Sequence, residues 1–211
     1  MFIYKWSVIT MHQDVTVDEE AIMETASNLT KNGMETTVVN SPSEALAFLL
    51  ETIPEGADVY GMTSVTLDEI GFTKELREGS RYISARKEVD GINDPAEHLG
   101  MMRKRSVISY AVGSANAVTR GGKLIFVSYT GSQLAPYAFT ADNVVLVIGA
   151  QKIAGDLQSA FKRIEEYVMG LEEKKVKPLG IHAAINKTMV INKETVKGRL
   201  RVILVRERLG F

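Results

Sequence analysis

The sequence contains no cysteine, and this absence excludes several kinds of functional site. Disulfides, thiolate zinc sites, iron–sulfur ligation and a cysteine nucleophile all need a thiol. A chain without disulfides fits a reducing cytoplasm. The three histidines, His12, His98 and His182, do not have the spacing of metal ligands. The sequence therefore predicts no metal site, and it names no cofactor.

An excess of one charge and long apolar runs are also lacking. The net charge is -1 and the pI is about 6.3, so no basic surplus points to nucleic acid or to an anionic membrane. The apolar runs are far shorter than the ~20 residues of a membrane-spanning helix. The first residues of the sequence lack the order of basic, then apolar, then small residues that is typical of a signal peptide. We therefore expect a soluble, cytoplasmic protein with no nucleic-acid partner and no membrane partner.

The composition and the order of the expected elements indicate one α/β domain over residues 1–211. With 45% hydrophobic and 24% charged residues, 211 residues can bury a full core. Helical and strand patterns alternate, which favours a mostly parallel open sheet with helices on both faces. Helices are expected over 16–33, 42–53, 67–78, 95–105 and 155–170. Strands are expected over 35–39, 58–61, 82–83, 107–112, 123–128, 143–148 and 200–205.

Several helix starts have capping signals. Residues 16–19 (Thr-Val-Asp-Glu) predict a capping box with Thr16 as N-cap, and residues 41–44 (Ser-Pro-Ser-Glu) place Ser at the N-cap and Pro at N1. Thr66 followed by Glu69 predicts another capping box at the start of the 67–78 helix.

The segment from Asn143 to Gly170 combines a continuous β-branched run, a short polar loop and an amphipathic helix. This is the pattern of a βα unit with a buried strand. Ligands in open α/β sheets bind where such strands end, and Lys152 and Asp156 lie at that point. Lys152 could pair with an anionic ligand, whereas Asp156 is better explained as a favourable charge at a helix N-terminus.

The loop from Gly61 to Glu69 places a glycine and three hydroxyls between a strand and a helix. Unpaired N–H groups at a helix N-terminus favour an anion, so Gly61, Thr63, Ser64 and Thr66 are candidate phosphate or carboxylate ligands. The simpler alternative is that Thr66 only caps the helix, and both can hold together. The Gly-Lys-Ser/Thr ending of a Walker loop is absent.

Two further polar loops follow expected strands. Residues 113–122 contain Asn116, Thr119 and Gly121, and residues 129–133 contain Gly131. Asn and Thr side chains can both donate and accept hydrogen bonds, which suits a ligand. The alternative is a structural turn in which Asn and Gly adopt unusual φ values. We expect the strand ends at 59–61, 107–112, 123–128 and 143–148 to converge on one cleft.

Together these loops resemble the LUD-domain family, the lactate-utilization proteins and their relatives. The resemblance runs in order through nearly the whole chain. It is carried by Gly61–Gly71, Ser114–Gly121, Val145–Gly149, Lys152–Asp156, Ala160–Ile164 and Val202–Phe211.

The resemblance implies a fold like ribose-5-phosphate isomerase, glucosamine-phosphate deaminase and the CoA transferases. It also implies a role in bacterial L-lactate oxidation beside iron–sulfur partner proteins. Many short members have a cysteine cluster before the final strand, but residues 178–197 contain none. Members usually have Glu where this chain has Arg120, and Arg cannot act as the glutamate nucleophile of CoA transferases.

Two functions from different classes are compatible with these residues. In the first, the protein is an accessory LUD protein that binds a small anionic metabolite in the strand-end cleft. In the second, it is an enzyme acting on a phosphorylated or CoA-linked substrate in the same cleft, with Asp68, Glu69 or Asp156 as base. A scaffold for iron–sulfur partners is a third reading. The sequence leaves the oligomeric state open, a homodimer included.

Overall fold

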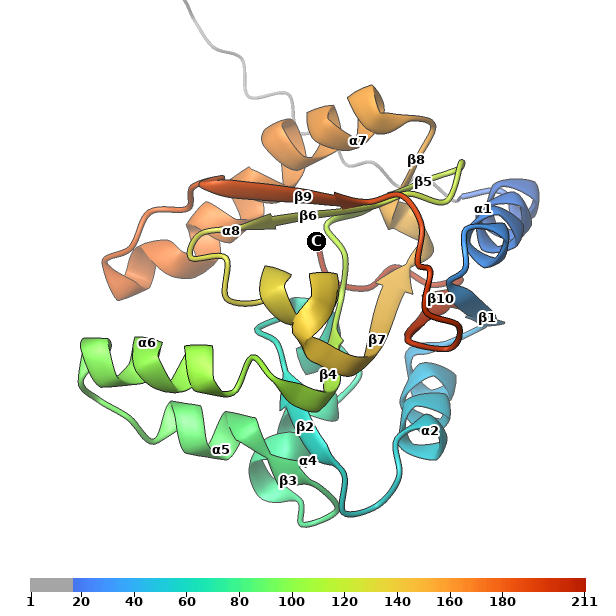
Figure 1. Ribbon diagram of the computed structural model, residues 1–211. Coiled ribbons are helices and arrows are strands. Elements are labelled where there is room, and N and C mark those ends of the chain that lie inside the picture. Colours follow the sequence, from blue (N-terminus) through green and yellow to red (C-terminus); the bar gives the residue numbers. More distant parts are fainter. Residues whose placement is uncertain (1–16) are drawn as a thin grey trace, which may run out of the picture.

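The computed structural model describes residues 17–211 and is built around a six-stranded parallel sheet (Figure 1). All five neighbouring strand pairs are parallel, as the alternation of elements predicted. The strand order is β1-β10-β7-β4-β2-β3. The bounds are β1 Glu35–Val39, β2 Asp58–Gly61, β3 Ile83–Ser84, β4 Ile108–Gly113, β7 Ala141–Gly149 and β10 Leu200–Val205.

A second, four-stranded sheet was not predicted. Its order is β8-β5-β6-β9, and it is mixed: β6 is antiparallel to both β5 and β9, whereas β8 is parallel to β5. The predicted strand 123–128 is β6, so it lies in this sheet and not in the main one. Only Arg120 to Lys123 separate β5 from β6, and a parallel pair would need a crossover of a dozen or more residues. The bounds are β5 Ala117–Thr119, β6 Leu124–Ser128, β8 Ile153–Ala154 and β9 Lys187–Ile191.

Most helices match the predicted positions, but the helix predicted to end at Gly170 continues to Val176. The 67–78 helix is two helices, because Gly71 between them has φ +84° and cannot continue the first one. Helix α5 had no clear sequence signal. The bounds are α1 Glu19–Lys31, α2 Pro42–Thr52, α3 Val65–Glu69, α4 Phe72–Glu78, α5 Ala85–Asp90, α6 Pro95–Lys104, α7 Leu157–Arg163 and α8 Met169–Val176, the last two joined by a π-helical turn.

Two of the three predicted caps can be compared with the structure. Ser41 caps α2 as predicted, accepting the N–H of Glu44 at 3.2 Å. The prediction that Thr66 caps its helix is wrong: Ser64 is the N-cap of α3, and Thr66 lies inside the helix, 1% exposed. The serine two residues earlier takes the cap position, because its hydroxyl accepts the N–H of Leu67. Thr16 lies outside the described residues.

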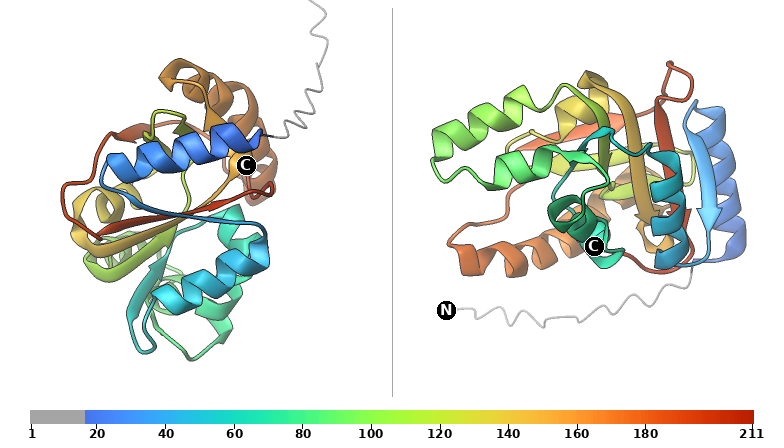
Figure 2. Two further views of the ribbon diagram at one scale, coloured as in Figure 1. Left: turned by 90° about the vertical axis from the view of Figure 1, so that its right-hand side faces the viewer. Right: turned by 90° about the horizontal axis from the view of Figure 1, so that it is seen from below.

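The main sheet is buried on both faces. Along β7, Val144, Leu146 and Ile148 pack on one side, and Val145 and Val147 pack on the other, because side chains of a strand alternate. Helices α1 and α2 lie on opposite sides of the sheet (Figure 2). Within residues 17–211, none of the helices has the length and apolar character needed to cross a bilayer.

The second sheet packs between the main sheet and helix α7. Leu124 and Phe126 of β6 join the core of the main sheet, whereas Ile125 packs with Ala160 and Ile164 on the far side. The molecule is therefore layered as helices, main sheet, second sheet and helices. This layering places the loop after β6 opposite the strand ends of the main sheet.

Candidate functional site

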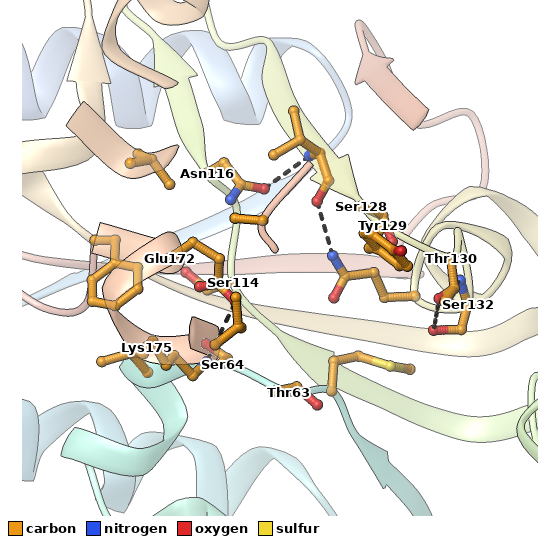
Figure 3. A pocket seen from close by; sticks show the side chains of 18 of the residues that line it. Thr63, Ser64, Ser114, Asn116, Ser128, Tyr129, Thr130, Ser132, Glu172 and Lys175 are labelled. Carbon is orange, nitrogen blue, oxygen red and sulfur yellow. Dashed lines mark hydrogen bonds and ion pairs between the residues drawn. The ribbon is translucent and has the colours of Figure 1, made fainter. Parts of the chain in front are cut away.

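A cavity of about 350 Å³ lies at the carboxyl ends of β2, β4 and β7. The loops after β2, β4, β6 and β7 all contribute to its lining, as the sequence predicted. Several hydroxyl and amide side chains from these loops face it (Figure 3). The polar residues of the lining include Ser64, Thr66, Ser114 and Asn116.

Lys152 is the most unusual residue of this lining. It follows β7 in a short turn, and its side chain is only 4% exposed. Its Nζ donates hydrogen bonds to Thr66 Oγ1 at 2.9 Å and to Ser114 Oγ at 3.1 Å. We call these three residues the lysine–hydroxyl cluster. Burial lowers the pKa of Lys152 from the usual 10.5 to about 7, and the positive charge of Arg163 acts in the same direction.

Within the described residues the amine of Lys152 forms no ion pair, although the nearby charge of Glu69 acts to raise its pKa. Among the ion pairs of residues 17–211, none includes Lys152, so its ammonium form is held by hydroxyls alone. A buried charge without a counter-ion is strongly disfavoured. An anion that reached the cavity could therefore form the direct ion pair that the ammonium group lacks.

The last residues of the chain fold over this cluster. Gln151 holds Leu209 by two hydrogen bonds: its Nε2 donates to Leu209 O at 2.7 Å, and its Oε1 accepts from Leu209 N at 3.2 Å. Gly210 N donates to Glu69 Oε2 at 2.6 Å. We call Leu209–Gly210 the C-terminal latch. It packs beside Lys152 and helps to exclude water from its amine.

Gly210 is needed for this close approach. Its φ is +64°, and a Cβ atom there would lie 2.4 Å from Thr66 Oγ1 and 3.2 Å from Lys152 Nζ. Any side chain would therefore collide with the hydroxyl that holds the lysine.

Other charged groups of the lining are paired. Arg86 forms an ion pair with Asp90 at 3.0 Å and donates to Thr63 Oγ1 at 3.0 Å. Lys175 lies 3.8 Å from Glu172, and both side chains are about one-third exposed. These residues lie on α5 and α8, and we call them the helical wall. Sequence reasoning missed them because they are on helices and not in strand-end loops.

Asn116 presents its amide to the cavity from a fixed position. Its Oδ1 accepts the N–H of Val127 at 2.9 Å, and its backbone carbonyl accepts from Arg163 Nη1 at 2.8 Å. Arg163 Nε also donates to Gln151 O at 3.3 Å, so Arg163 joins the loops that carry Asn116 and Lys152. Burial lowers the pKa of Arg163 to about 10.

Thr119 and Gly121 do not line the cavity. Thr119 Oγ1 accepts from Lys123 N at 3.0 Å, and Gly121 O accepts from Asn32 Nδ2 at 3.0 Å. Both residues belong to the β5–β6 turn, which fastens helix α1 to the second sheet. The structural-turn alternative accounts for their positions.

Gly61 and Gly131 also lie outside the cavity lining. A Cβ atom on Gly61 would lie 2.3 Å from Leu76 Cδ1, so this glycine allows α4 to pack against the end of β2. Gly131 has φ +88° and donates its N–H to Ser128 Oγ at 2.9 Å, which shapes the loop after β6.

The carboxylates considered as bases do not line the cavity, although Glu69 binds the C-terminal latch beside Lys152. Asp68, Glu69 and Asp156 are not among the cavity residues, and Asp156 caps α7 in a capping box, as its simpler reading predicted. The carboxylates that do line the cavity are Asp90 and Glu172.

Two histidines line the cavity although they are far apart in the sequence. His98 comes from α6, and His182 follows α8, where its Nδ1 lies 3.0 Å from Glu173 Oε1. His12 lies outside the described residues. Within residues 17–211, no three His, Asp or Glu side chains are grouped so that they could hold a metal ion.

The fold and the site define a class of protein: an α/β domain with a cavity at the carboxyl ends of its parallel strands, where ligands commonly bind in open α/β sheets. The model of the LUD domain matches residues 22–205. The chain therefore belongs to the LUD-domain family.

The fold is shared with a solved structure. The crystal structure of a DUF162-family protein from Deinococcus radiodurans superposes with a TM-score of 0.56 at 12% sequence identity, covering 88% of this chain and 96% of that one. The chain matches none of the curated proteins. At this identity the likeness concerns the fold alone.

Proposed function

We propose that this LUD-domain protein binds a small anionic metabolite in the strand-end cavity, with Lys152 as the group that carries the countercharge. The observation that supports this is the lysine–hydroxyl cluster: a 4% exposed amine that lines a cavity and is held by two hydroxyls without a carboxylate. An anion beside Lys152 would replace the missing counter-ion.

We place the anion beside Lys152, whereas the sequence suggested the N-terminus of the helix that follows β2. Helix α3 has only five residues, so its dipole is small, and Ser64 already accepts one of its free N–H groups. Lys152, Thr66 and Ser114 instead supply a full charge and two hydroxyls at one point. Asn116 adds an amide that can orient the rest of the ligand.

A cavity of about 350 Å³ is near the lower end of the usual range for small-molecule sites, about 300–1,000 Å³, which favours a compact metabolite over a whole nucleotide–thioester. We therefore favour a small carboxylate or phosphate over a CoA-linked substrate. The family resemblance implies three further properties, which stay predictions: an accessory role in L-lactate oxidation, iron–sulfur partners and a likeness to CoA transferases.

Thermal-shift titrations with L-lactate, inorganic phosphate and coenzyme A test this proposal. At 100 times its Kd, a bound ligand stabilises the protein by about 2.7 kcal/mol. We expect lactate or phosphate to raise the melting temperature of the wild-type protein and of Lys175→Met, but not of Lys152→Met. Equal stabilisation of the Lys152→Met variant would show that the anion binds elsewhere.

A further inference from the structure

The amine of Lys152 has features that are suited to chemistry with carbonyl compounds. A lysine attacks a carbonyl carbon only as the neutral amine, and a solvated lysine is almost entirely protonated at neutral pH. The 4% exposed side chain lies against the C-terminal latch, away from bulk water, but still lines the cavity. Because burial lowers its pKa to about 7, a large share of the amine is neutral under physiological conditions.

The hydroxyls around the amine can serve the proton transfers that such a reaction needs. Ser114 Oγ lies 3.1 Å from Lys152 Nζ and also lines the cavity, so it can contact both the amine and a bound substrate. Thr66 Oγ1, at 2.9 Å, is the second partner of the amine, and it lies 3.4 Å from Ser114 Oγ. A hydroxyl can donate and accept, so neither contact is lost when the amine changes its protonation state.

From this geometry we propose that Lys152 forms a Schiff base with a small 2-oxo acid bound in the cavity. This inference rests on the proposed anion binding, because the carboxylate of the same ligand is what brings it to Lys152. The ammonium form pairs with the carboxylate, and the neutral form attacks the carbonyl carbon beside it.

The reaction balances without an oxidant or a reductant. The ammonium group first releases one proton. Its nitrogen then forms a bond to the carbonyl carbon, and a proton moves from nitrogen to the former carbonyl oxygen. The carbon–oxygen bond breaks as the released proton is taken up again, and the oxygen leaves as water. The products are a protonated imine on Lys152 and one molecule of water.

The 2-oxo acids are favoured over simple ketones and aldehydes for an electrostatic reason. A protonated imine keeps the positive charge of the ammonium group in a site where no carboxylate of residues 17–211 forms an ion pair with it. In a 2-oxo acid, the carboxylate lies on the adjacent carbon and neutralises that charge within the adduct. A ketone without a carboxylate would leave the charge unpaired.

Reductive trapping with pyruvate and cyanoborohydride tests this inference. The reductant converts the imine to a stable secondary amine, and peptide mapping by mass spectrometry locates it. We expect one reduced pyruvyl group on Lys152 in the wild-type protein and in Lys162→Met, which replaces an exposed lysine of α7 outside the cavity. L-lactate is the matched control, since it has the same carboxylate and no carbonyl, and it should leave no adduct.

The outcomes separate this inference from the proposed function. Thermal stabilisation by both pyruvate and lactate without an adduct on Lys152 would overturn the Schiff base and leave anion binding intact. An adduct spread over surface lysines, and equally present in Lys152→Met, would also overturn it. If neither pyruvate, lactate nor phosphate stabilises the protein, the proposed function itself is wrong.

Discussion

Two lysines line the same cavity and meet opposite surroundings. Lys152 is 4% exposed and bonded to two hydroxyls, whereas the side chain of Lys175 is 33% exposed and lies 3.8 Å from a carboxylate. Exposed ion pairs such as that of Lys175 contribute little to stability. A buried amine without an ion pair lowers the stability of the folded protein. Proteins retain such a destabilising residue where it serves a functional site.

The largest expected effect is a gain of stability in Lys152→Met. The pKa of Lys152 falls from 10.5 to about 7 on folding, so the native state binds fewer protons than the unfolded state between these pH values. The destabilisation caused by Lys152 is therefore complete below pH 7. The free energy of unfolding rises again as the pH rises from 7 towards 10.5. Replacing the lysine by methionine should stabilise the ligand-free protein by as much as about 5 kcal/mol at pH 6.

Urea unfolding of the wild type and of Lys152→Met at pH 6 and pH 9 measures this difference. It should be largest at pH 6 and smaller at pH 9. Lys175→Met is the control and should change stability by less than about 1 kcal/mol at either pH. A Lys152→Met protein that is less stable than the wild type at pH 6 would contradict the cost assigned to the buried amine.

The next effect concerns the pH dependence of anion binding. Only the ammonium form of Lys152 supplies a countercharge, so the affinity for L-lactate should be constant below pH 7 and fall about tenfold per pH unit above it. Calorimetric titration between pH 6 and pH 9 measures this, and lactate itself stays ionised throughout. A flat affinity profile would mean that Lys152 is not the anion's partner.

A third effect concerns the close contact between the C-terminal latch and Thr66. In Gly210→Ala, the new Cβ would lie 2.4 Å from Thr66 Oγ1, so we expect a loss of about 1–3 kcal/mol from overpacking. Gly56→Ala is the matched control: its φ is also positive, +77°, but no atom lies within 4 Å of the new Cβ.

The Gly56 variant should therefore show only the backbone strain, about 1–2 kcal/mol. Beyond stability, displacement of the latch should expose Lys152 to water and raise its pKa. The fall in lactate affinity should then begin at a higher pH in Gly210→Ala than in the wild type or Gly56→Ala. An unchanged pH profile would show that the latch does not shield the amine.

The smallest expected effect is the difference in lactate affinity between variants of Ser64 and of Thr66. Ser64→Ala removes the N-cap of α3 and should cost about 1 kcal/mol or less, because the bond to Leu67 N is long at 3.4 Å. Thr66→Val removes an acceptor of Lys152 and should weaken lactate binding more than Ser64→Ala does. The reverse order of affinities would favour the anion position that the sequence first suggested.

The local elements of the main sheet could be predicted from the sequence. The β-branched run of β7 and the Ser-Pro start of α2 depend on neighbouring residues only, and both appear where they were expected. Convergence of the loops after β2, β4 and β7 also followed, because parallel strands bring their carboxyl ends to one edge of a sheet, whereas the loop after β6 reaches the cavity from the second sheet. The choice between two hydroxyls two residues apart, Ser64 and Thr66, was beyond such patterns.

The sequence by itself determined the family, the parallel sheet and the strand-end segments in which Lys152, Thr66 and Ser114 lie. Only the tertiary structure decided that Lys152 is buried, that a second sheet forms, and that helices α5 and α8 add charged groups to the cavity. The physical reason is that desolvation and ion pairing depend on contacts between residues far apart in the chain. Thr66 and Lys152 are 86 residues apart, and the hydrogen bond between them exists only once the fold is complete.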